Sequence, residues 1–159
     1  MKFVKPTENE LFVLRSIANY QFSEDIGKYL FTDDILVFKS PKTKRIRTVS
    51  LNGQIIASLR AHDNFILLTP EGASRIISKL NGKFVVVAAD VAIPFIKKGR
   101  SLFAKHVLNA DTSIIPKSEV IVVSKENEVI ATGTALLSAD EMIMFKKGIA
   151  VKIRHGINT

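Results

Sequence analysis

The sequence has 159 residues, 47% of them hydrophobic and 24% charged, which is enough apolar material for one domain or two small ones. Its apolar runs are of strand length, so no membrane-spanning helix is expected, and the absence of cysteine excludes disulfides and thiolate zinc sites and predicts a cytoplasmic location. The net charge of +8 indicates an acidic partner, nucleic acid first and an anionic surface second, although charge that serves only solubility would look the same.

The chain opens with helical patterns. A helix is predicted over residues 8–20, because apolar residues recur at three- and four-residue spacing at Leu11, Leu14, Ile17 and Ala18. Thr7 is its expected N-cap, and Glu10 completes a capping box. A second, short helix is expected over residues 24–31, with Ser23 as its N-cap.

The period then changes to two, which predicts strands over residues 35–38, 44–49, 55–60 and 65–68. Asn52 and Gly53 suit a type I′ hairpin turn, because that turn needs positive φ at both central positions. A helix follows from Pro70, with Thr69 as N-cap, and ends at Leu80. The sequence therefore predicts a first α+β module over residues 1–81.

The second half is expected to form a module over residues 82–159. Its predicted elements are strands over 83–88, 102–108, 119–124, 129–137 and 149–155, and helices over 90–98 and 139–147. Asp90 and Ser138 are the expected N-caps, while Gly99 and Gly148 are expected to stop the helices in left-handed conformations. Many short strands with tight turns indicate a small barrel or a curled sheet, so the predicted class is α+β.

A first basic cluster lies at the predicted end of helix 90–98. It comprises Lys97, Lys98, Gly99 and Arg100, with Lys105 on the next strand. A phosphate group is expected to bind there against side-chain and backbone donors. A solvated helix end, where the helix dipole favours cations without any ligand, explains the same residues equally well. Phe95 and Phe103 lie nearby and have the spacing of core residues, although either ring would also suit base stacking.

A second basic cluster follows the first predicted strand, at Lys39, Lys42, Lys44, Arg45 and Arg47. A two-residue turn at Asn52-Gly53 sets Arg60 opposite Arg45, so that Arg45, Arg47 and Arg60 are expected to share one face and contact RNA. The alternative is a charged edge strand that resists aggregation.

Catalytic chemistry finds no support in the sequence. His62, His106 and His155 have no zinc spacing, and no phosphate-loop or dinucleotide motif is present. Paired carboxylates such as Asp140-Glu141 lie at helix starts or turns, where capping explains them. We therefore expect no catalytic residues, no metal site and no cofactor.

Several motifs occur in order between Lys83 and Ile157. They run over residues 94–105, 115–123, 131–138 and 141–154. In this order they resemble a PUA domain, the RNA-binding module named after pseudouridine synthases and archaeosine transglycosylases. Residues 17–22, 43–47, 57–61 and 68–73 are similar to the module that precedes the PUA domain in archaeal tRNA-guanine transglycosylases.

The resemblance implies a PUA-type β pseudo-barrel with short helices and an RNA-binding surface around its first helix. That surface would include the first basic cluster, and the last strand would extend it with Lys152 and Arg154, which alternate along the strand, while His155 falls on the other side. Two departures are Lys117-Ser118-Glu119, where the family usually has Gly-Asp or Gly-Glu, and Thr134, where a basic residue is common.

The resemblance also implies a function. The family's catalytic part is a (β/α)₈ barrel with paired aspartates and a Cys-rich zinc site, and this sequence has neither the length nor a cysteine for it. We therefore expect a non-catalytic protein that binds tRNA near the acceptor stem and works with a separate catalytic transglycosylase chain in tRNA modification. The alternatives are a stand-alone RNA adaptor in translation or ribosome biogenesis and a protein–protein module.

Overall fold

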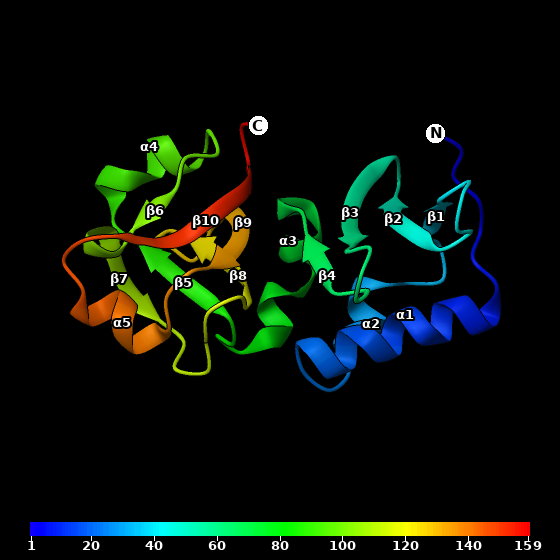
Figure 1. Cartoon of the computed structure of the whole chain (residues 1–159), viewed down its shortest axis with the longest axis horizontal. Coiled ribbons are helices and arrows are strands. Elements are labelled where there is room, and N and C mark those ends of the chain that lie inside the picture. Colours follow the sequence, from blue (N-terminus) through cyan, green and yellow to red (C-terminus); the bar gives the residue numbers. More distant parts are fainter. The chain divides into compact units, whose positions relative to one another are not determined.

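The computed structural model describes all residues, Met1–Thr159, and the chain forms two compact units, Met1–Leu80 and Asn81–Thr159 (Figure 1). Both units mix helices with mainly antiparallel strands, which confirms the predicted α+β class. None of the helices combines the length and the apolar character that crossing a membrane would require.

The N-terminal unit contains three helices and one antiparallel sheet in the order β1-β2-β3-β4. Its elements are α1 (Glu8–Gln21), α2 (Ile26–Leu30), β1 (Leu36–Lys39), β2 (Ile46–Leu51), β3 (Gln54–Leu59), β4 (Ile66–Leu68) and α3 (Pro70–Leu80). Helix α1 packs on α2, α2 on α3, and α3 on β3. The buried residues of this unit are mainly apolar and include Leu14, Leu30, Phe31, Ile56 and Ile76.

Helix α1 begins with the predicted capping box. The Thr7 side chain accepts a hydrogen bond from the Glu10 N–H at 3.1 Å, and the Glu10 carboxylate accepts one from the Thr7 N–H at 2.9 Å. The expected cap of α2 by Ser23 is wrong, because α2 begins only at Ile26. Its first turn is instead capped from another helix, since Asn19 of α1 accepts from the Gly27 N–H at 2.7 Å.

The hairpin between β2 and β3 has the predicted turn but a different register. Asn52 and Gly53 both have positive φ, 52° and 80°, as a type I′ turn requires. Beyond the turn, Ser50 pairs with Ile55 but Val49 pairs with Ala57, so one extra residue in β3 forms a bulge. The bulge shifts all pairing farther from the turn by one residue.

The expectation that Arg60 faces Arg45 is therefore wrong. With the shifted register Arg45 lies opposite Ala61, and its guanidinium donates to the Ala61 carbonyl at 3.5 Å. The predicted strand over 44–49 also begins later, at Ile46, because Lys44 has a φ of 62° and belongs to the preceding turn.

The C-terminal unit is a six-stranded sheet that curls into a nearly closed pseudo-barrel, with strand order β6-β10-β9-β8-β5-β7 (Figure 1). Its strands are β5 (Val85–Ala88), β6 (Leu102–Phe103), β7 (Val107–Ala110), β8 (Glu119–Val123), β9 (Val129–Ala135) and β10 (Ile149–Gly156). Short helices lie at η1 (Asp90–Ala92), α4 (Ile93–Ile96), η2 (Ala104–His106) and α5 (Ala139–Met144). Apolar side chains from strands and helices fill the interior, including Val86, Ile96, Leu102, Val122 and Met142.

The predicted strand over 102–108 is divided by η2, since β6 pairs with β10 at one edge of the sheet and β7 pairs with β5 at the other. One continuous strand cannot pair at both edges, so the turn at η2 carries the chain from one edge to the other. The left-handed stop at Gly99 (φ 90°) is confirmed, and Ser138 caps α5 in a second capping box. Gly148 also has a positive φ, 96°, but the expectation that it stops the helix is wrong, because α5 ends at Met144 and the backbone of Phe145 is already extended. Asp90 makes no capping bond, which makes that prediction wrong; its carboxylate lies 3.5 Å from the Lys125 ammonium.

Candidate nucleic-acid interface

The C-terminal unit has a surface pocket of about 560 Å³ beside the end of α4. It is lined by Val91, Ala92, Phe95, Gly99, Arg100, Ser101, Phe103, Lys105, His106 and Ile149. The left-handed Gly99 turns the chain out of α4, and the Arg100 N–H donates back to the Phe95 carbonyl at 3.1 Å. Strand β6 then pairs Phe103 with Ile149, which brings both sides of the pocket together.

Apolar rings and cations share this pocket. Phe95 is 57% exposed and Phe103 is 46% exposed, so the expectation that both are core residues is wrong. Phe95 belongs to α4, which has only four residues and does not bury all its side chains. Phe103 belongs to β6, which lies at the edge of the sheet. Both rings are therefore exposed to solvent. Arg100 and Lys105 are exposed beside the rings, and neither takes part in an ion pair.

The first basic cluster is divided by the fold. Gly99, Arg100 and Lys105 line the pocket described above. Lys97 instead lines a separate depression, whose lining includes the carboxylates Asp90, Glu126 and Glu128. Lys98 is exposed but lines neither pocket. Two of the five predicted positions thus lie outside the lining of the pocket that holds the other three.

The cations of the last strand also differ from each other. Lys152 pairs with Thr134 on β9, which pairs with Glu119 on β8, so these three residues lie on one face of the sheet. Arg154 lies at a register shift in β10 and reaches across the same face, where its guanidinium donates to both carboxylate oxygens of Glu119. Lys152 is exposed, whereas Arg154 has this intramolecular partner.

The family models now divide the chain in two. Residues 13–83 match the patch-forming domain C2 of tRNA-guanine transglycosylase, and residues 84–157 match the PUA domain. The chain is a PUA domain protein. Its resemblance to the C-terminal part of archaeal tRNA-guanine transglycosylases is thereby confirmed.

The sequence relatives are much longer proteins. The tRNA-guanine(15) transglycosylase of Pyrococcus abyssi is 43% identical over 156 residues, which are 97% of this chain and 26% of the relative. That of Methanothermobacter thermautotrophicus is 37% identical over 154 residues, 96% of this chain and 24% of the relative. The chain therefore spans about a quarter of the length of the curated relatives it matches.

Solved structures with this fold are similar over the whole chain. A hypothetical protein from Pyrococcus horikoshii has a TM-score of 0.78 at 21% identity and covers 99% of this chain and 96% of its own. A conserved PUA domain protein from Thermoplasma acidophilum has a TM-score of 0.69 at 19% identity, covering 99% and 93%. At this identity the likeness supports the fold, and the predicted pseudo-barrel with short helices is confirmed.

The second basic cluster lies in the C2 domain, where its member Lys39 and the nearby Arg60 have acidic partners. Arg60 donates through Nε and Nη2 to the Asp63 carboxylate at 3.0 and 2.6 Å, and its guanidinium lies 4.7 Å from the centre of the Phe65 ring. Lys39 lies 2.8 Å from the Glu10 carboxylate. Lys42, Lys44 and Arg45 are exposed and form no ion pair, while Arg47 is half-buried.

The Arg60–Asp63 pair has a measurable consequence. The Arg60 hydrogen bonds lower the pKa of Asp63 to about 2. Because the pKa is lower in the folded state than the ordinary 3.8, the interaction stabilises the fold above pH 3.8 and is lost as the pH falls through about 2. We expect an NMR titration of the Asp63 carboxyl to give a midpoint near 2, and the Arg60→Gln variant to move it toward 3.8. An unchanged midpoint in that variant would contradict the assignment of cause.

Proposed function

We propose that the chain binds RNA, with tRNA as the first candidate, through the pocket of the PUA domain beside α4. The observation that carries this proposal is the pairing of exposed aromatic rings, Phe95 and Phe103, with the exposed cations Arg100 and Lys105 in one concave face. Cations without an acidic partner bind backbone phosphates, and exposed rings stack on unpaired bases.

Recognition of a base-paired stem would depend on shape and phosphates, because the deep groove of A-form RNA hides the base edges. The acceptor stem of tRNA offers both a duplex backbone and an unpaired end. In this proposal, Arg100 and Lys105 contact the backbone and the two rings receive the unpaired end. Lys152, exposed on β10, is a further candidate for a phosphate contact, whereas Arg154 already holds Glu119.

The biological role that we propose is a non-catalytic one in tRNA modification of the archaeosine type. The support comes from the relatives, which are tRNA-guanine(15) transglycosylases that this chain matches over about a quarter of their length. The catalytic chemistry would come from a separate transglycosylase chain. A base-exchange assay is expected to need both chains, and activity of this chain alone would overturn the non-catalytic assignment.

A stand-alone RNA adaptor in translation or ribosome biogenesis is the second candidate. The exposed rings and cations of the pocket suit this alternative too, because they would contact RNA in either role. Affinity purification separates the two roles. Recovery of a barrel-type transglycosylase supports the first, and recovery of ribosomal particles supports the second.

The binding site is tested by charge reversal. We expect Arg100→Glu and Lys105→Glu each to weaken tRNA binding by roughly tenfold to hundredfold, and each to reduce the slope of log affinity against log salt by about 1. Lys97→Glu is the matched control, because it changes the net charge equally at a residue that lines a separate depression outside the pocket. We expect the loss of tRNA affinity in Lys97→Glu to be severalfold smaller than the loss in Arg100→Glu or Lys105→Glu.

Binding curves at several salt concentrations decide the outcome. An equal loss in Lys97→Glu would show that only net charge matters and that the pocket is not the site. A tRNA affinity that changes neither with salt concentration nor with charge reversal would overturn the proposed RNA binding.

A further inference from the structure

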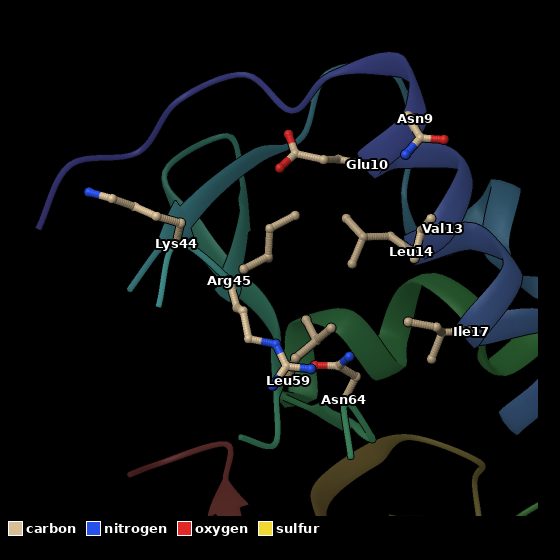
Figure 2. Close-up of a pocket in the computed structure, with 10 residues that line it drawn as sticks. Asn9, Glu10, Val13, Leu14, Ile17, Lys44, Arg45, Leu59 and Asn64 are labelled. Atoms are coloured by element: carbon tan, nitrogen blue, oxygen red, sulfur yellow. The ribbon is translucent and has the colours of Figure 1, made fainter. Parts of the chain in front are cut away.

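The C2 domain has a groove of its own between α1 and the β2–β3 hairpin, shown in Figure 2. Its volume is about 210 Å³. Val13, Leu14 and Ile17 of α1 line one side, and Ile46 and Leu59 of the sheet line the other. Leu14 and Leu59 are buried floor residues, while Val13 is 46% exposed. The groove therefore presents apolar side chains to solvent at its mouth.

Polar side chains surround this apolar floor. Arg45 reaches the rim from the turn before β2 and Asn64 from the turn before β4, while the side chain of Lys44, in the same turn as Arg45, extends away from the groove (Figure 2). The side-chain amide of Asn64 makes no hydrogen bond within the protein, and Arg45 has only the long 3.5 Å bond to the Ala61 carbonyl. These groups are available to a ligand.

One acidic residue, Glu10, also lines the groove, and its charge is already compensated. Its carboxylate lies 2.8 Å from the Lys39 ammonium and accepts the Thr7 N–H at 2.9 Å. The bond with Lys39, followed by that with the Thr7 N–H, keeps the pKa of Glu10 below its ordinary value. The uncompensated charge at the rim is thus that of Arg45, which is positive.

We propose that this groove binds one unpaired nucleotide of the RNA, which makes it a second contact that rests on the RNA binding proposed above. The base lies against Val13, Ile17 and Ile46, and Arg45 takes its phosphate. The amide of Asn64 supplies both a donor and an acceptor for a base edge. The positive rim favours a nucleotide over an apolar side chain of a protein, and the small volume excludes a duplex.

The test uses two RNA hairpins that differ at one position. One is fully paired, and the other carries a single unpaired 2-aminopurine, whose fluorescence reports its surroundings. We expect the parent protein to bind the second hairpin about tenfold more tightly and to change its fluorescence, since contacts to one base are worth a little over one kcal/mol. We expect the paired hairpin to keep its affinity in all the groove variants below.

Two pairs of variants locate the contact. Val13→Trp fills the groove, and Ser16→Trp adds the same bulk on the exposed side of α1 outside it. Arg45→Ala removes the phosphate contact, and Lys42→Ala removes a neighbouring exposed cation outside the groove. We expect the preference for the unpaired nucleotide to disappear in Val13→Trp and Arg45→Ala and to persist in both controls. Val13 and Arg45 are exposed, so the fold is expected to tolerate both changes, and a thermal melt verifies this.

The failures are distinguishable. Equal affinity for the two hairpins in the parent, or a preference that survives both Val13→Trp and Arg45→Ala, overturns the nucleotide groove while RNA binding stands. That result leaves the groove to a protein side chain. If neither hairpin binds, the proposed function fails. NMR spectra of the protein with 5′-mononucleotides then test whether the groove binds a nucleotide. Methyl shifts at Val13 and Ile17 in the parent support it, and their absence overturns it.

Discussion

Replacing Glu119 with alanine is expected to lower the free energy of unfolding by about 3 kcal/mol, the largest effect that we predict for a single substitution. The Glu119 side chain is only 1% exposed, and its carboxylate accepts hydrogen bonds from Nη1 and Nη2 of Arg154, whose side chain is 23% exposed. The alanine variant would leave a mostly buried cation without its carboxylate. Urea unfolding of the parent and the variant measures the difference.

The double variant Glu119→Leu/Arg154→Met is the control. It removes both charges together, so no buried charge is left uncompensated, and we expect it to recover most of the lost stability. The single variants Glu119→Leu and Arg154→Met complete the comparison. If the double variant loses as much free energy of unfolding as these two lose in sum, the ion pair is not the cause. A loss below about 0.5 kcal/mol in Glu119→Ala would show that solvent reaches the pair freely.

Replacing Gly72 with alanine is expected to cost about 2 kcal/mol, although alanine is the better helix former. Gly72 lies in the first turn of α3, where α3 packs on β3. A Cβ atom at this position would lie 2.0 Å from the Ile56 carbonyl oxygen, which belongs to the backbone and cannot rotate away. Helix propensity alone favours alanine by about 1 kcal/mol, whereas forced overpacking costs about 1–3 kcal/mol. A loss of stability in Gly72→Ala would therefore indicate the close contact with the Ile56 carbonyl, whereas a gain would indicate helix propensity alone.

The substitution Ser74→Ala on the same helix provides the comparison. Ser74 is exposed, and its hydroxyl bonds only to the Pro70 carbonyl of its own helix at 2.9 Å. We expect a change within about 0.5 kcal/mol there. Thermal and denaturant unfolding of both variants gives the values. A Gly72→Ala variant that is more stable than the parent would contradict the close approach of α3 to β3.

Features that depend on a few neighbouring residues could be predicted from the sequence. The capping boxes at Thr7 and Ser138 and the type I′ turn at Asn52-Gly53 are confirmed, because each depends on bonds or φ values within about four residues. The left-handed stop at Gly99 is confirmed for the same reason. The resemblance to a PUA domain added what local patterns could not supply, namely the pseudo-barrel and the region where an RNA surface is expected.

Features that depend on distant partners could not be predicted in this way. The first turn of α2 is capped by Asn19 from α1, and the bulge in β3 separates Arg45 from Arg60. Neither event leaves a signal in the residues next to it. The exposure of Phe95 and Phe103 likewise depends on how little of α4 and β6 the rest of the unit covers.

Composition and local pattern were therefore sufficient for the basic character of the chain and for most of its helices, strands and turns. Which cations remain available was a matter of tertiary structure alone. The same charge on a side chain is compensated at Arg154, whose carboxylate partner the fold supplies, and uncompensated at Arg100 and Lys105. The Coulomb energy of a cation depends on what lies within a few ångströms, and only folding brings Glu119, 35 residues away in sequence, to Arg154.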